Sequence, residues 1–184
     1  MPESNPQPTG KIFSHLVYIE DVPEQGLDLS ISADPAARQA LAEADGLAGI
    51  ESLEADFHVA RQGLETFNVS GTLRAKVTQV CVLSLEPFDS EIVEEIDVDF
   101  APPSEAARAA ESAGTIVGVP GAPERDPPDP LVDGTIDVGA LAAEFLALGL
   151  DPYPKKPGVE FAPMTDPEEK DGPFDVLRKL TDRG

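Results

Sequence analysis

Three consecutive segments in the middle of the chain alternate apolar and polar residues at every second position. The apolar residues that share a face within each segment are Leu53, Ala55, Phe57 and Val59; Phe67, Val69, Leu73, Ala75 and Val77; and Phe88, Ile92, Ile96, Val98 and Phe100. This period is typical of strands that bury one face. The connections at Gln62-Gly63 and Cys81–Pro87 are short, so an antiparallel meander is predicted. Gly71 marks the point where a barrel-like sheet is expected to bend or bulge.

Shorter elements flank the predicted meander. Phe13–Ile19 and Leu27–Ala33 are strand-like runs, and the second of them alternates cleanly. Asp34-Pro35 supplies an N-cap and a first-turn proline for a short helix that ends near Gly46–Gly49. A second helix is expected to begin after Asp137, which is placed to cap it.

The remaining segments are rich in proline and charge. Residues 1–11 are interpreted as a disordered tail, and residues 101–131 as a flexible excursion with at most one turn of helix at Ser104–Ala113. Residues 162–184 are predicted to form an acidic linker followed by a short amphipathic helix. The prediction is therefore a single α+β domain over residues 12–161. Its long antiparallel β-meander is expected to curl into a partial barrel with a few short helices packed on it.

Negative charge dominates the composition and limits the partners. The chain has 13 Lys+Arg and 35 Asp+Glu, a formal net charge of -22. Such a surface repels phosphate, and Lys155-Lys156 and Arg178-Lys179 are the close basic doublets that could oppose this effect. The same charge disfavours anionic membranes and attracts basic proteins. The N-terminus resembles no secretory signal, and no apolar run is long enough to span a bilayer, so a cytoplasmic location is expected.

An acidic strip lies on the third strand of the predicted meander. Glu95, Asp97 and Asp99 alternate with apolar residues and are expected to project together to the solvent side. The strip could be a divalent-metal or docking site, but the favoured interpretation is a charged face that keeps a long strand soluble. If the hairpin turn is centred between Ser84 and Leu85, Arg74 lies opposite Glu95, a pair worth about 0.2–1 kcal/mol.

Candidate chemistry elsewhere is sparse. His15 and His58 lie on different predicted strands, with no nucleophile, phosphate-binding or dinucleotide motif beside them. Cys81 opens a tight connection as half of a zinc site does, but Ser84 stands where a second cysteine would be needed. A single thiolate does not close a tetrahedral structural site. No catalytic residue, metal or cofactor is therefore predicted.

Several motifs occur in an order that resembles a known family. They are VCVLSLEPF at 80–88, the acidic strand after it, VDGTIDV at 132–138 and EFLALGLDPYP at 144–154. In this order they resemble the bacterial YceD-like family, the large ribosomal RNA subunit accumulation proteins. The similarity runs from about Phe13 to Phe161 and extends to a Pro173-Phe174 tail seen in many proteobacterial relatives.

This chain departs from the family at one position that matters for chemistry. Many members have C-x-x-C where Cys81 and Ser84 stand, often with further cysteines near the C-terminus, and this chain has neither. It resembles the type that lacks the cysteine pair, so a metal role is not carried over. The resemblance implies a part in the accumulation or maturation of 23S ribosomal RNA, and it implies no enzyme.

The leading hypothesis is a non-enzymatic ribosome-biogenesis factor that binds a basic ribosomal protein or assembly factor. Its association with 23S rRNA is expected to be indirect, with no small-molecule substrate. The residues predicted to contact the partner are Glu95, Asp97, Asp99, Asp133, Asp137, Glu144, Asp151 and Tyr153. One alternative is a divalent-metal-dependent RNA-processing enzyme that uses Glu95, Asp97 and Asp99. Another is direct RNA binding through the two basic doublets.

Overall fold

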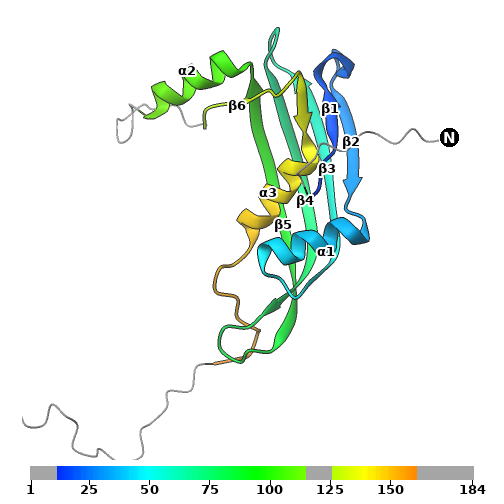
Figure 1. The fold of residues 1–184 in the computed structure, drawn as a ribbon, viewed down its shortest axis with the longest axis vertical. Helices are drawn as coiled ribbons and strands as arrows, with labels where there is room; N and C mark the ends of the chain where they lie inside the picture. Colours follow the sequence, from blue (N-terminus) through cyan, green and yellow to red (C-terminus); the bar gives the residue numbers. More distant parts are fainter. Residues whose placement is uncertain (1–11, 115–125, 161–184) are drawn as a thin grey trace, which may run out of the picture.

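A computed structural model describes residues 12–114 and 126–160 of the chain (Figure 1). Its elements, in chain order, are β1 (Leu16–Tyr18), the 3-10 helix η1 (Ile19–Asp21), β2 (Leu27–Ser32), α1 (Pro35–Asp45), β3 (Gly49–Arg61), β4 (Phe67–Val80), β5 (Pro87–Ala101), α2 (Pro103–Gly114), β6 (Asp129–Pro130), β7 (Thr135–Asp137) and α3 (Val138–Gly149). The predicted disordered tail and the predicted C-terminal helix lie outside these residues. None of the helices within the described ranges is long and apolar enough to cross a membrane.

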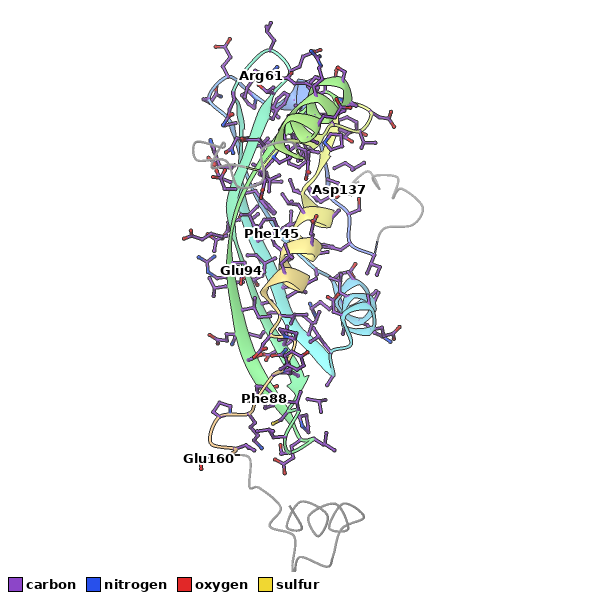
Figure 2. The ribbon with its side chains drawn as sticks, turned by 90° about the vertical axis from the view of Figure 1, so that its left-hand side faces the viewer. Arg61, Phe88, Glu94, Asp137, Phe145 and Glu160 are labelled. Carbon is purple, nitrogen blue, oxygen red and sulfur yellow. The ribbon has the colours of Figure 1, made fainter. Side chains whose placement is uncertain are left out.

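The alternating segments form the long strands of one sheet, as predicted. Strands β2, β3, β4 and β5 pair antiparallel in that order, and the short β6 joins β5 in parallel, so the five-stranded sheet is mixed. The apolar faces of β3 and β4 are buried, as are Ile92, Ile96 and Phe100 of β5. Both α1 and α3 cover this apolar face, which Figure 2 shows with the sheet seen from its side.

The predicted partial barrel is not formed. The sheet is neither closed nor strongly curled, because α1 and α3 cover its apolar face and the sheet does not need to fold onto itself (Figure 2). Nor is there a bulge at Gly71, which pairs with Phe57 and Ile96 in unbroken register. The glycine is needed for a different reason. A Cβ atom there would collide with the carbonyl oxygen of Asp56.

The register of the β4–β5 hairpin differs from the prediction by two residues. Arg74 pairs with Val93, and Glu95 pairs with Thr72, so the predicted pairing of Arg74 with Glu95 is wrong. The turn is centred one residue earlier than the sequence suggested, and this moves every cross-strand partner by two. The Nη1 atom of Arg74 instead donates a hydrogen bond of 3.2 Å to Oδ2 of Asp56 on β3.

A second, two-stranded sheet joins the beginning of the described chain to the beginning of α3. Strand β1 pairs antiparallel with β7, and it is shorter than the predicted run Phe13–Ile19. The Val138 N–H donates to the His15 carbonyl oxygen at 3.0 Å, which continues this pairing into the first residue of α3. The N-terminal segment thus lies beside α3, more than a hundred residues away in sequence.

The segment after β5 contains more regular structure than predicted. Helix α2 has 12 residues where at most one turn was expected. Proline is tolerated at the first helical position, and the alanines that follow favour helix. The side chain of Ala106 is buried, and the Leu131 N–H donates to the Ala101 carbonyl oxygen at 2.8 Å. Residues 115–125 lie outside the described ranges.

Candidate functional site: an acidic cleft beside α3

Two adjoining cavities run along the exposed side of α3. One has a volume of about 670 Å³ and lies between β1, β7 and the start of α3. The other has a volume of about 390 Å³ and lies between β5 and the second half of α3. Asp129 and Glu144 line both cavities, so the two form one continuous cleft. We call it the acidic cleft and define it by its carboxylates, which are Asp97, Asp99, Asp126, Asp129, Asp133, Asp137 and Glu144.

The charge of the acidic cleft has one sign. Seven carboxylates line it, and no lysine, arginine or histidine of the described residues does. Apolar side chains lie between the carboxylates. Tyr18 is 41% exposed, Val132 64% and Leu148 70%. The cleft is therefore built to receive a group that is cationic at its tip and apolar along its length.

Asp137 has a structural role in the acidic cleft. Its Oδ1 atom accepts hydrogen bonds from the backbone N–H groups of His15, at 2.9 Å, and Ala140, at 3.1 Å. Its Oδ2 atom accepts one from the Ser14 hydroxyl at 2.8 Å. The side chain therefore caps α3, as predicted from the sequence, and also holds the N-terminal segment against it. Figure 2 shows Asp137 and Phe145 on the helix-covered side of the sheet.

The predicted acidic strip on β5 is divided in the structure. Asp97 and Asp99 line the acidic cleft, and the Asn68 side-chain amide on β4 donates to both of them, at 2.7 and 2.8 Å. Glu95 lies outside the cleft, in register with Thr72. The amide of Asn68 thus positions the two aspartates of the strip that face α3.

The turn before β7 positions Asp133. Asp133 and Gly134 both have positive φ, 51° and 68°, and the Thr135 N–H donates to the Val132 carbonyl oxygen at 2.9 Å. An Asp-Gly pair favours this conformation. Sequence reasoning selected Asp133 but missed four lining residues: Tyr18, Asp126, Asp129 and Leu148. The signal for Leu148 was an apolar residue on a helix that already buries its other face, whereas nothing local marks the two aspartates among the prolines.

Two other predicted contact residues lie away from the acidic cleft. Asp151 and Tyr153 follow α3, where the Asp151 carboxylate accepts a hydrogen bond of 2.9 Å from the Tyr153 N–H. This segment packs beside the β4–β5 turn, since the Val82 N–H donates to the Pro154 carbonyl oxygen at 2.9 Å. Of the eight predicted residues, five line the acidic cleft, and Glu95, Asp151 and Tyr153 do not.

The Cys81 thiol is buried in the β4–β5 turn. Its sulfur accepts a hydrogen bond of 3.5 Å from the Ser84 N–H. Hydrogen bonds from the Ser84 side chain, then from the backbone of Lys156 and Ser84, lower the pKa of Cys81 from 9.0 to about 6, although desolvation opposes them. Within residues 12–114 and 126–160, no group of three or more His, Cys, Asp or Glu is placed to hold a metal ion.

Asp28, His58 and Ser70 lie side by side on β2, β3 and β4 but do not form a catalytic triad. The Nδ1 atom of His58 is 2.7 Å from the Asp28 carboxylate. The Nε2 atom faces Gly26, because a Cβ atom built there would lie 2.7 Å from it. A serine nucleophile needs a hydrogen bond to this nitrogen, and none joins Ser70 to His58 in the described part of the chain.

Comparison with known proteins agrees with the resemblance seen in the sequence. A family model described as "Large ribosomal RNA subunit accumulation protein YceD" matches residues 69–181, more than half of the chain. The matched span begins in β4 and contains every carboxylate of the acidic cleft, whereas β1, β2, α1 and β3 precede it. No curated protein and no solved structure matches the chain.

Proposed function

Since the chain belongs to the YceD family of large ribosomal RNA subunit accumulation proteins, we propose that it supports this accumulation by holding a basic protein segment in the acidic cleft. Family membership implies a role in 23S rRNA and large-subunit accumulation. The partner in this proposal is a basic ribosomal protein or an assembly factor. The family is assembly-related and is not a known enzyme family, and the proposed role needs no catalytic step.

The single observation that carries the proposal is the composition of the acidic cleft. Its carboxylates would meet lysine and arginine tips, while Val132 and Leu148 offer apolar surface to their aliphatic stems. Opposite potentials also speed the encounter of the two proteins and disfavour acidic competitors. A basic ribosomal protein normally faces rRNA phosphate, and the acidic cleft presents comparable charge to it.

Charge also favours a protein partner over direct contact with RNA. The net charge of -22 repels phosphate. In the doublet Lys155-Lys156, the Lys156 ammonium already donates to the Glu86 carboxylate at 2.8 Å. This pairing leaves Lys155 as the doublet's cation without a carboxylate partner among the described residues. An indirect association with 23S rRNA, through the bound protein, follows from this arrangement.

The test is a charge reversal in the acidic cleft, compared with a matched reversal elsewhere. Glu144→Lys combined with Asp129→Lys changes two exposed residues that line both cavities. The control is Glu43→Lys combined with Glu51→Lys, which makes the same change in net charge at exposed positions on α1 and β3. Each protein is expressed in cells depleted of the original, and co-purified proteins and 23S rRNA are quantified.

We expect the cleft variant to lose its basic partner and to leave 23S rRNA depleted, while the control restores both. The wild-type interaction should weaken as salt rises, since screening reduces the attraction. Full restoration of 23S rRNA by the cleft variant would contradict the proposal, as would equal loss with the control.

A further inference from the structure

A third cavity, of about 380 Å³, lies where the end of α1, the end of β4 and the segment after α3 meet. None of the residues that line it lines the acidic cleft. It is therefore a separate site, and the inference drawn from it does not depend on the function proposed above.

A buried carboxylate oxygen in this cavity has no partner. The Oδ2 atom of Asp45 is shielded from solvent, and no described residue donates a hydrogen bond to it. Desolvation by burial raises the pKa of Asp45 above its ordinary value. Buried polar atoms in folded proteins are almost always hydrogen-bonded, and an unpaired one costs about 1–3 kcal/mol or more for a charged group.

The position of Asp45 in α1 increases this cost. Asp45 is the last residue of the helix, and Gly46 follows as a left-handed C-cap with φ 68°. The negative end of the helix dipole lies there, which disfavours a carboxylate. The last turn of α1 has no basic residue that could compensate. Helix end, burial and missing partner therefore all favour a cation at this place.

The rest of the cavity suits the aliphatic part of a cationic side chain. Its walls include the apolar residues Leu47, Val80, Ala147, Leu150, Pro152 and Pro154. A second carboxylate, that of Asp151, also lines it, and no lysine, arginine or histidine of the described residues does. Gln79, which is only 7% exposed, adds a carboxamide whose oxygen accepts a hydrogen bond of 2.9 Å from the Ser90 hydroxyl.

We propose that this cavity binds an alkylammonium or alkylguanidinium group, with the cationic end on the Asp45 carboxylate and the alkyl chain against the apolar walls. Such a group occurs at the end of lysine and arginine side chains and in free polyamines. It supplies the hydrogen-bond donors and the positive charge that the chain itself does not provide to Asp45.

The test uses the full chain and small probes of known chemistry. n-Butylguanidinium is titrated into the protein at neutral pH, and the methyl signals of Leu47 and Val80 are followed by NMR. n-Butylurea is the neutral control, because it has the same shape without the charge. The protein variants are Asp45→Asn, which keeps the shape of the side chain, and Asp129→Asn, which alters the acidic cleft and leaves this cavity intact.

We expect saturable shifts with n-butylguanidinium, no saturation with n-butylurea, and roughly tenfold or weaker binding in Asp45→Asn, the ratio that corresponds to loss of one charge-assisted hydrogen bond. Asp129→Asn should bind the probe as the wild type does. Parallel titrations with spermidine and with N-acetyl-arginine methylamide show whether a polyamine or a protein side chain is the better ligand. Equal responses to n-butylurea, or unchanged affinity in Asp45→Asn, would overturn the inference.

A thermal melt gives a second measurement that does not need tight binding. Removing an unpaired buried charge should raise the Tm of Asp45→Asn at neutral pH, and the probe should raise the Tm of the wild type only. A lower Tm for Asp45→Asn, with no effect of the probe on either protein, would show that Asp45 serves the fold alone and would also overturn the inference. Because the acidic cleft is not involved, either result leaves the proposed function standing.

Discussion

Gly139, in the first turn of α3, lies directly against the backbone of His15. A Cβ atom at position 139 would lie 2.5 Å from the His15 nitrogen and 2.8 Å from the Ser14 Cα atom. The obstacles are backbone atoms, which cannot rotate away as a flexible side chain can. The absence of a side chain at Gly139 thus allows the N-terminal segment to pair along β7 and to close one end of the acidic cleft.

Replacing Gly139 by alanine is expected to destabilise the protein by about 1–3 kcal/mol, because the methyl group has no room. The free energy of unfolding, measured with a chemical denaturant, checks this. Gly49→Ala is the matched control, since no atom lies within 4 Å of a Cβ there. Equal stability of the two variants would show that Ser14 and His15 move aside at little cost.

Asp137 and Glu144 are predicted to differ in what they contribute, although both line the acidic cleft. Asp137→Ala removes the helix cap and the bonds to Ser14 and His15, so we expect it to lower the free energy of unfolding by about 1–2 kcal/mol. Glu144→Gln should leave stability within about 0.5 kcal/mol of the wild type and weaken partner binding. Unfolding curves and co-purification separate the two effects, and a destabilised Glu144→Gln variant would contradict the assignment.

The cross-strand partners of Arg74 can be identified with double-mutant cycles. Arg74 and Asp56 should show a coupling of about 0.2–1 kcal/mol, the usual range for exposed pairs. Arg74 and Glu95 should show none, because Arg74 pairs with Val93. The measurement is the free energy of unfolding of the four proteins in each cycle. Stronger coupling to Glu95 than to Asp56 would mean that the hairpin has the register first predicted from the sequence.

The Cys81 thiol makes stability depend on pH in a defined window. Its pKa is lowered to about 6 in the folded protein, from an ordinary value of 9.0. The folded state therefore binds fewer protons than the unfolded state between these values, and the free energy of unfolding should rise with pH from about 6 to 9. Below pH 6 this contribution is lost.

The Ser84 hydroxyl is the first cause of that shift, so Ser84→Ala should raise the pKa of Cys81 and narrow the window. Thiolate absorbance measured as a function of pH reports the pKa directly. Cys81→Ser, which has no titrating thiol, is the control for other groups. An unchanged titration in Ser84→Ala would show that the backbone N–H groups alone are responsible.

Local patterns in the sequence predicted much of the fold correctly. Period-two alternation identified β2 to β5 and their buried faces, since neighbouring side chains on any strand point to opposite sides. Asp34 and Asp137 were identified as helix caps, and both accept the predicted backbone hydrogen bonds from residues three positions later. Each of these inferences depends on residues within a few positions of one another, where backbone geometry leaves few alternatives.

The relationships between distant segments did not follow from these patterns. A turn centred one residue earlier gave Arg74 a different partner, and helices covered a sheet that was expected to curl. Glu95 was grouped with Asp97 and Asp99 by alternation, yet only the two aspartates line the acidic cleft. Alternation determines the face of a strand, whereas the neighbours beyond its edge depend on how other elements pack.

By itself, then, the sequence determined the strands, their apolar faces, the helix caps and a strongly acidic surface, because these follow from local geometry and composition. Its motifs also pointed to the family that the comparison confirmed over residues 69–181. Only the tertiary structure decided that Asp126, Asp129 and Asp133 meet Asp97, Asp99 and Glu144 around α3, and that Asp45 is buried without a partner. Burial and convergence depend on contacts between distant segments, and side-chain packing settles those contacts only when the whole domain folds.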